Sequence, residues 1–421
     1  MQRLKDSARA KIGHLSRFFG TDMMYVVKSG FWMNANFVLV SLFGLLSSVL
    51  FARLISKDVY GTYQYILAIA GLIAVITPNN MSSAVLQSVA RGNEGDLKVG
   101  TKFQMRWGAI ASSVASLLSL WYAIHGNAPL AIAMIIVAIF MPAANAFNTW
   151  NAYVQGKKDY KRYFYYSTLN TVISYGGVIA MLYFTKSFIW IAFGNIFFGF
   201  IGNFLIYKMT VKQMKPNEKT DPEMIPYGRH LSIMGIPQGL VGSLDALLIF
   251  HYLGAPELAV YSFATLFPER LSGGLKFISS IAFPKFSAKS EQDVQGFFHK
   301  KIWWLLLFLA GVAALYAIFA PYLFEFLFPT YMSAVPFTRL YSLSFFGIAA
   351  SFVQTALTSQ KKTRELYIST VSTPFIKATL MIILMFYFGV WGVIYAQLLT
   401  TLFQIIFPIY LFKKSSVNIS N

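Results

Sequence analysis

The sequence predicts an all-α integral membrane protein with about twelve transmembrane helices. Its 421 residues are 56% hydrophobic and only 12% charged, which is about half the charged fraction of a soluble domain. Windows of twenty or more apolar residues recur along the chain, and each is long enough to cross the roughly 30 Å hydrocarbon core of a bilayer. The alternating segments typical of membrane β-barrels are missing from the sequence. Helices are therefore expected, because a backbone in lipid must satisfy its own hydrogen bonds.

The apolar segments divide the chain into twelve predicted spans. They lie at about 30–52, 60–80, 103–124, 129–153, 163–184, 188–208, 230–252, 257–283, 299–324, 333–358, 365–388 and 390–412. The first apolar run is too long for the core of a signal peptide, and no small-residue cleavage site follows it at the expected distance. We therefore interpret this run as an uncleaved first span.

The distribution of Lys and Arg predicts the orientation of these spans. Of the 35 basic residues, 28 fall in the two ends of the chain or in the even-numbered loops, and three fall in odd-numbered loops. Because basic loops are retained in the cytoplasm, both termini and the even-numbered loops are expected there. The net charge of +19 then serves orientation and attraction to anionic lipid, and no nucleic-acid partner is expected.

A long polar loop divides the chain into two halves of six spans. We expect a cytoplasmic amphipathic segment at 1–29, an N-terminal six-helix bundle at 30–209 and a cytoplasmic linker at 210–229. A C-terminal six-helix bundle follows at 230–412, with a cytoplasmic tail at 413–421.

The two halves carry similar patterns about 200 residues apart. The first span ends with FARLISKDVYGTYQY and the seventh with FHYLGAPELAVYSFA. Both place a small residue two positions before a tyrosine, as Gly61-x-Tyr63 and Ala259-x-Tyr261. Such repeats are typical of transporters whose halves move around a central site, and six spans in each half make the repeats parallel. The two bundles are therefore expected to be related by pseudo-symmetry.

These motifs resemble the MOP superfamily, specifically its bacterial polysaccharide branch of Wzx-type O-antigen flippases. The resemblance covers nearly the whole chain and is carried by the signature AR-L-x-x-x-x-x-YG-x-Y from Ala52 to Tyr63, by LGAPELAVYSFA from Leu253 to Ala264 and by GKKDYKRY after the fourth span. It implies a MOP/MATE-like fold in which two six-helix bundles form a V-shaped, cation-lined cavity. The two additional helices that are usual in the peptidoglycan-precursor members are missing.

The resemblance also implies a function. Members of that branch carry undecaprenyl-diphosphate-linked oligosaccharides, such as O-antigen or other surface polysaccharide units, from the cytoplasmic to the periplasmic or outer face of the bacterial inner membrane. Alternating access is the implied mechanism. The implied partners are the lipid-linked oligosaccharide, the phospholipid bilayer, a polysaccharide polymerase and a chain-length regulator.

Four basic residues fall inside predicted spans, and all belong to the second half. They are Arg270 and Lys276 in the eighth span, Arg339 in the tenth and Lys377 in the eleventh. Charged side chains inside a bilayer usually face a cavity or a partner. Because Arg and Lys bind phosphate oxygens well, one hypothesis is that these four bind the diphosphate or another anionic cargo. For Arg339, which lies near a helix end, the alternative is snorkelling to the membrane surface.

Asp245 is predicted to be the only acid well inside a span, the seventh. One interpretation is a site that couples export to an H+ or Na+ gradient. The other is a fixed counter-ion for Arg270 or Lys276, which Glu269 could also supply. No cofactor is expected. The chain has no cysteine and its five histidines are scattered, so no metal site is expected either.

Polar amides in the fourth span form a further candidate site. Asn148, Asn151 and Gln155 recur at i, i+3 and i+7, on one face of a helix. Amides are unfavourable against lipid, so this face is expected to point inward and to bind either sugar hydroxyls or another helix. Asn36 in the first span and Gln354 in the tenth allow the same two interpretations.

The sequence argues against an enzyme. It contains no clustered carboxylate pair for acid–base chemistry and no Gly-rich phosphate loop. A MATE-like, cation-coupled exporter of small molecules would share the twelve spans but would favour acids in its cavity. One interior acid against three or four interior bases instead favours an anionic substrate. A passive scaffold for glycan assembly would leave the interior cations unexplained.

Overall fold

The structure is a computed structural model that describes residues 23–287, 293, 296 and 302–417. Within these ranges, the side chains of residues 23–27, 276–285, 287, 413 and 415–417 are not described. The predicted amphipathic segment at 1–29 lies largely outside the described residues, and the predicted tail at 413–421 does so in part.

The described chain is built from helices, and no strand occurs within it. The first half contains α2 (Met23–Leu54), α3 (Lys57–Ile76), α4 (Met81–Ala90), α5 (Asp96–Ile124), α6 (Ala128–Phe147), α7 (Thr149–Gly156), α8 (Tyr160–Phe184) and α9 (Phe188–Met214). The second half contains α10 (Met224–Gly242), α11 (Leu244–Leu253), α12 (Ala255–Ser287), α14 (Ile302–Leu327), η1 (Pro329–Ala334), α15 (Val335–Tyr341), η2 (Ser342–Phe346), α16 (Gly347–Ser359), α17 (Thr363–Phe388) and α18 (Val390–Val417).

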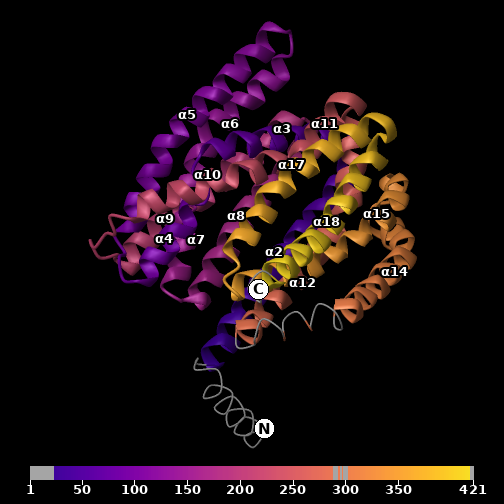
Figure 1. The fold of residues 1–421 in the computed structure, drawn as a ribbon. Helices are drawn as coiled ribbons and strands as arrows, with labels where there is room; N and C mark the ends of the chain where they lie inside the picture. Colours follow the sequence, from indigo (N-terminus) through magenta and orange to yellow (C-terminus); the bar gives the residue numbers. More distant parts are fainter. Residues whose placement is uncertain (1–22, 288–292, 294–295, 297–301, 418–421) are drawn as a thin grey trace, which may run out of the picture.

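This arrangement confirms the predicted class of fold, an all-α membrane protein with two six-helix bundles. Within the described residues, eleven continuous or broken helices are long and apolar enough to cross a membrane. The 33-residue α12 lies where the eighth span is predicted and completes a twelve-span arrangement. Figure 1 shows the purple helices of the first half beside the orange and yellow helices of the second half, with the α5–α6 hairpin extending beyond its neighbours.

Several spans that the sequence predicts as continuous are broken in the structure. The second span ends at Ile76, because Thr77 is extended before Pro78, and α4 then starts as a separate helix. The seventh span breaks at Ser243, whose φ of −118° and ψ of 5° are not helical. The tenth span is a chain of short 3-10 and α segments from Pro329 to Ser359. Hydropathy predicts the length of an apolar run but not the breaks within it.

The two halves meet at a close crossing between α3 and α12. A Cβ atom at Gly61 would lie 1.8 Å from the carbonyl oxygen of Ala255, so only glycine permits this approach. The ring of Tyr65 stacks on that of Phe250 with centroids 3.8 Å apart. Close by, the Thr330 hydroxyl donates to the Ala52 carbonyl at 2.8 Å. The signature at the end of the first span therefore lies at the contact between the halves.

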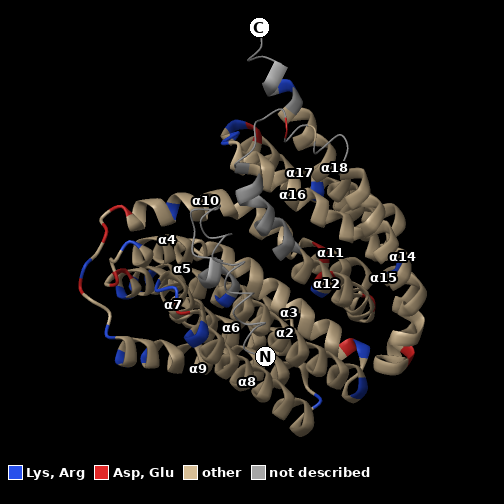
Figure 2. Ribbon diagram, turned by 90° about the horizontal axis from the view of Figure 1, so that it is seen from below, with Lys and Arg blue, Asp and Glu red and all other residues tan. Residues whose placement is uncertain are grey.

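Charged residues lie mainly at helix ends and in loops, with few among the central helices (Figure 2). One group attaches the linker to the first half. Glu94 accepts hydrogen bonds from Lys157 Nζ at 2.5 Å, from the Tyr153 hydroxyl at 2.8 Å and from the Asn217 N–H at 3.3 Å. Burial raises the pKa of Glu94, but these hydrogen bonds outweigh burial and hold the pKa below its ordinary value. The linker is thus fixed to the α4–α5 loop and to the end of α7.

Candidate functional site

A cavity of about 850 Å³ lies between the two halves and is lined by residues of α2, α3, α8, α9, α10, α11 and α12. We call it the central cavity. Its wall is rich in aromatic rings and hydroxyl groups; the aromatic members are Phe37, Phe51, Tyr60, Tyr63, Tyr175 and Tyr261. Its volume lies in the range of small-molecule binding sites. The cavity thus combines aromatic faces with hydrogen-bonding groups at the contact between the two halves.

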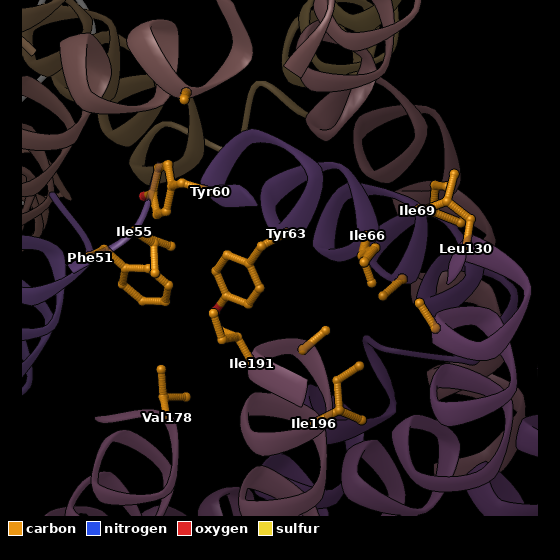
Figure 3. Packing of buried hydrophobic residues seen from close by; sticks show 14 of the residues in the cluster. Phe51, Ile55, Tyr60, Tyr63, Ile66, Ile69, Leu130, Val178, Ile191 and Ile196 are labelled. Carbon is orange, nitrogen blue, oxygen red and sulfur yellow. The ribbon is translucent and has the colours of Figure 1, made fainter. Parts of the chain in front are cut away.

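The repeated tyrosines of the sequence both line this cavity. Tyr63 projects from α3 toward Ile191 (Figure 3), and its hydroxyl accepts a hydrogen bond from Asn195 Nδ2 at 2.8 Å. Tyr261 on α12 donates instead to Asp245 Oδ2 at 2.8 Å. Equivalent positions of the two halves therefore face one cavity, with an amide behind one tyrosine and a carboxylate behind the other.

Arg270 reaches from α12 across the cavity to α2. Its Nη1 donates to the Ser41 carbonyl at 2.7 Å, and its guanidinium lies over Gly44, where a Cβ atom would be 2.4 Å from Nη1. The side chain is half-buried. A guanidinium has five N–H donors, so the single hydrogen bond to Ser41 leaves donors for a ligand. Arg270 is the one basic residue among the described residues that line the central cavity.

Two acids face this cavity, where the sequence predicts one. Asp245 lies in the first turn of α11 and also accepts the N–H of Ala246 at 2.8 Å. Glu269 lines the cavity as well and accepts the hydroxyl of Tyr341 at 3.0 Å. Among the described residues there is no ion pair between Asp245 and Arg270. The count of one interior acid against three or four bases does not hold for this cavity, whose described wall contains two acids, Asp245 and Glu269, and one base, Arg270.

The other predicted cations are placed differently. Arg339, in the last turn of α15, is exposed and donates from Nε to the Ala317 carbonyl at 2.9 Å. Lys377 is half-buried on α17, one turn after Pro374. Neither lines the central cavity. The side chain of Lys276 lies outside the described residues. Of the four predicted phosphate-binding residues, the structure thus brings Arg270 into the cavity.

The amides of the fourth span do not line the central cavity either. Asn148 lies at the break between α6 and α7 and is exposed. Gln155 donates to the side chain of Asn151, so these two amides satisfy each other within one helix. The amides that do line the central cavity are Gln64 and Asn195, which the sequence analysis missed. Gln64 directly follows Tyr63 of the signature, and this position beside the motif could have indicated that Gln64 lines the cavity.

A second cavity of about 520 Å³ lies within the C-terminal bundle. We call it the glutamine cavity, because its wall contains Gln238, Gln354, Gln397 and Gln404. It shares Glu269 and Gly273 with the central cavity, so the two are neighbours across α12. No group of three or more metal-ligating side chains occurs among the described residues.

The chain has the fold of solved transporters of the MOP superfamily. The structure is similar to that of the lipid II flippase MurJ in an inward closed conformation, with a TM-score of 0.67 and 15% identity over 92% of this chain and 87% of that one. It is also similar to an outward-facing MATE multidrug resistance transporter, with a TM-score of 0.58, 14% identity and coverage of 93% and 96%. A third similar structure is a MOP transporter from Pyrococcus furiosus described by the reverse polarity of its binding pocket, with a TM-score of 0.51, 14% identity and coverage of 92% and 96%.

At the level of sequence, the chain belongs to the family of polysaccharide biosynthesis proteins, whose model matches residues 50–330. No curated protein matches the chain in sequence. The match begins at the end of the first span and runs to η1, so it includes both signature segments and every residue that connects the two halves at the α3–α12 crossing.

Proposed function

We propose that this protein is a flippase that moves undecaprenyl-diphosphate-linked oligosaccharides, such as an O-antigen or other surface polysaccharide unit. The observation that carries the proposal is the central cavity, in which the Arg270 guanidinium faces tyrosine, serine and amide side chains. A lipid-linked oligosaccharide needs a cation for its diphosphate and neutral hydrogen-bonding groups with aromatic faces for its sugars. Membership of the polysaccharide biosynthesis family supports this substrate class.

The proposed orientation places both termini and the linker in the cytoplasm of a bacterial inner membrane. The distribution of basic residues supports it. In that orientation the hydrogen bonds from Thr330 to Ala52 and from Arg53 Nη2 to the Phe326 carbonyl join the halves at the outer end. We propose that transport by alternating access breaks these contacts as the cargo leaves. A polymerase and a chain-length regulator are the proposed recipients and partners.

A MATE-like, cation-coupled exporter is the second candidate. The observation that favours it is the pair of carboxylates, Asp245 and Glu269, in the wall of the central cavity, because acids attract cationic drugs and coupling ions. The same carboxylates also fit a flippase that is driven by an H+ or Na+ gradient.

Complementation separates the two candidates. The chain is expressed in bacterial strains that lack their own O-antigen flippase, and surface glycan is measured by gel and by antibody. Restored glycan, with no change in resistance to cationic drugs, is the expected result. Resistance to such drugs without restored glycan in any strain would replace the flippase proposal with the exporter.

A further inference from the structure

We propose that the glutamine cavity binds a neutral sugar residue of the cargo, while Arg270 in the central cavity holds the diphosphate. This inference rests on the proposed function and adds the place of the glycan. The cavity is lined from five directions, by α10, α12, the α15–α16 region, α17 and α18. Its wall contains one charged residue, Glu269, and no Lys or Arg among the described residues. A diphosphate would find no cation there, so the chemistry of the wall selects an uncharged polar ligand.

The four glutamines have no partner within the described chain. None of the side-chain amides of Gln238, Gln354, Gln397 and Gln404 takes part in an intramolecular hydrogen bond there. Three of the residues are partly exposed and Gln238 is exposed, and all four line the cavity. An amide at membrane depth is unfavourable unless water or a ligand satisfies it. The four glutamines around this cavity therefore differ from Asn151 and Gln155, whose side chains hydrogen-bond to each other.

Amides and hydroxyls match the chemistry of a sugar. Each hydroxyl of a sugar both donates and accepts a hydrogen bond, and a glutamine amide offers two donors and a carbonyl acceptor. On α18, Gln397, Thr401 and Gln404 follow at i, i+4 and i+7, so they form one polar stripe along the cavity. A sodium ion would instead require several converging oxygen atoms, with acids among them.

Ser272 gives an independent observation. It lines the glutamine cavity, is 8% exposed and has a buried hydroxyl with no hydrogen-bond partner in the described chain. Such an unsatisfied hydroxyl destabilises the empty protein. A ligand hydroxyl in the cavity is the class of group that would satisfy it.

The test uses the full-length protein in nanodiscs that contain no sugar detergent. The probes are methyl α-D-glucopyranoside and methyl N-acetyl-β-D-glucosaminide, and binding is measured by saturation-transfer NMR. Wild type is expected to bind at least one glycoside. The double variant Gln397→Leu/Gln404→Leu should bind roughly tenfold more weakly or worse, because it loses two hydrogen-bonding amides at nearly constant volume. The Gln87→Leu variant is the matched control, since Gln87 is exposed on α4 and lines neither cavity.

The Ser272→Ala variant keeps the inference testable if the double variant is unstable. Removing an unsatisfied hydroxyl should leave the Tm of the sugar-free protein unchanged or higher and should weaken glycoside binding. A purely structural role for Ser272 predicts a lower Tm and unchanged binding, and that result would contradict the inference.

Three further outcomes would overturn the inference. The first is that neither glycoside binds wild type. The second is that binding persists in the double variant. The third is that sodium chloride raises the Tm of wild type, that neither glycoside does, and that the effect of sodium chloride is smaller in the double variant. This result would make the cavity a cation site.

Glycan export in cells separates this inference from the proposed function. If the double variant restores as much surface glycan as wild type, the glutamine cavity does not serve the cargo, and the flippase proposal stands. Failure of wild type itself to restore glycan, with glycoside binding intact, would contradict the flippase proposal alone.

Discussion

The two halves present equivalent tyrosines to one cavity but surround them with different chemistry. Behind Tyr63 the first half places an amide, Asn195, and behind Tyr261 the second half places a carboxylate, Asp245. The second half also supplies Arg270 and Glu269, whereas the first half supplies no charged residue to the described wall. The equivalent tyrosines of the two halves therefore lie in different electrostatic surroundings. The first half offers a neutral surface, and the second half holds the groups that respond to charge.

The first half is not without charges, but they serve structure. Glu94 and Lys157 lie at the linker, outside both cavities, and the pKa of Glu94 is lowered there by its hydrogen bonds despite some burial. The pair of Glu94 and Lys157 thus holds segments of the first half together, whereas Asp245, Glu269 and Arg270 of the second half face the central cavity.

The largest expected effect comes from removing the cation of the second half. Arg270→Ala should lower glycan export about tenfold or more, because charge-assisted hydrogen bonds to phosphate contribute about 1.5–3 kcal/mol. Arg270→Lys should retain part of the activity if charge alone matters. It should retain little if the planar guanidinium binds phosphate through two parallel hydrogen bonds, which lysine cannot form. Export is measured as surface glycan per unit of protein in the membrane.

Arg339→Ala is the control for this prediction, since Arg339 is exposed and lines neither cavity. Its export should stay within about twofold of wild type, as is usual for surface substitutions. Equal export by the Arg270→Ala and wild-type proteins would remove Arg270 from the proposed phosphate site.

A smaller effect is expected when the second half is made to resemble the first. Asp245→Asn gives Tyr261 an amide partner, as Tyr63 has, and removes one charge while keeping an acceptor for the tyrosine hydroxyl. Export should fall by about fivefold, equivalent to about 1 kcal/mol, and a comparison of pH profiles tests whether Asp245 also couples transport to an ion gradient. Transport into inverted vesicles at several pH values measures this. An unchanged rate with an unchanged pH profile would exclude ion coupling through Asp245.

The smallest effect is expected at the linker. Glu94→Gln should lower the Tm by a few degrees at neutral pH, because the charge that attracts Lys157 is lost, and should leave glycoside binding unchanged. The lowered pKa of Glu94 means that its stabilisation is present above the unfolded pKa of about 4.3 and is lost as pH falls through the folded value. The difference in Tm between variant and wild type should therefore vanish in acid. A difference that persists after Glu94 is fully protonated in acid would show that the carboxylate charge is not what holds the linker.

The repeats and the fold could be predicted from the sequence because they depend on local patterns. Apolar runs determine the number of spans, since a backbone in lipid that lacks the alternating pattern of a β-barrel must be helical. The signature tyrosines Tyr63 and Tyr261 could be paired by their spacing alone. Gly61 could be recognised as part of a motif. The physical reason that a glycine is needed there, the close approach of the Ala255 carbonyl, is a contact between residues almost 200 positions apart and appears only in the structure.

Membership of the cavities was decided only by the tertiary structure. Arg270, Arg339 and Lys377 look alike as cations within apolar runs, yet packing places Arg270 against α2, leaves Arg339 exposed and puts Lys377 outside the central cavity. Helix rotation and the breaks within spans determine which face turns inward, and neither follows from hydropathy. The glutamine cavity is the clearest case: Gln238, Gln354 and Gln404 are far apart in the chain, and only the packing of α10, α16 and α18 around α12 brings their amides to one place. The sequence thus determined a twelve-helix membrane protein with two related halves, and the long-range packing of those helices decided which polar groups meet a substrate.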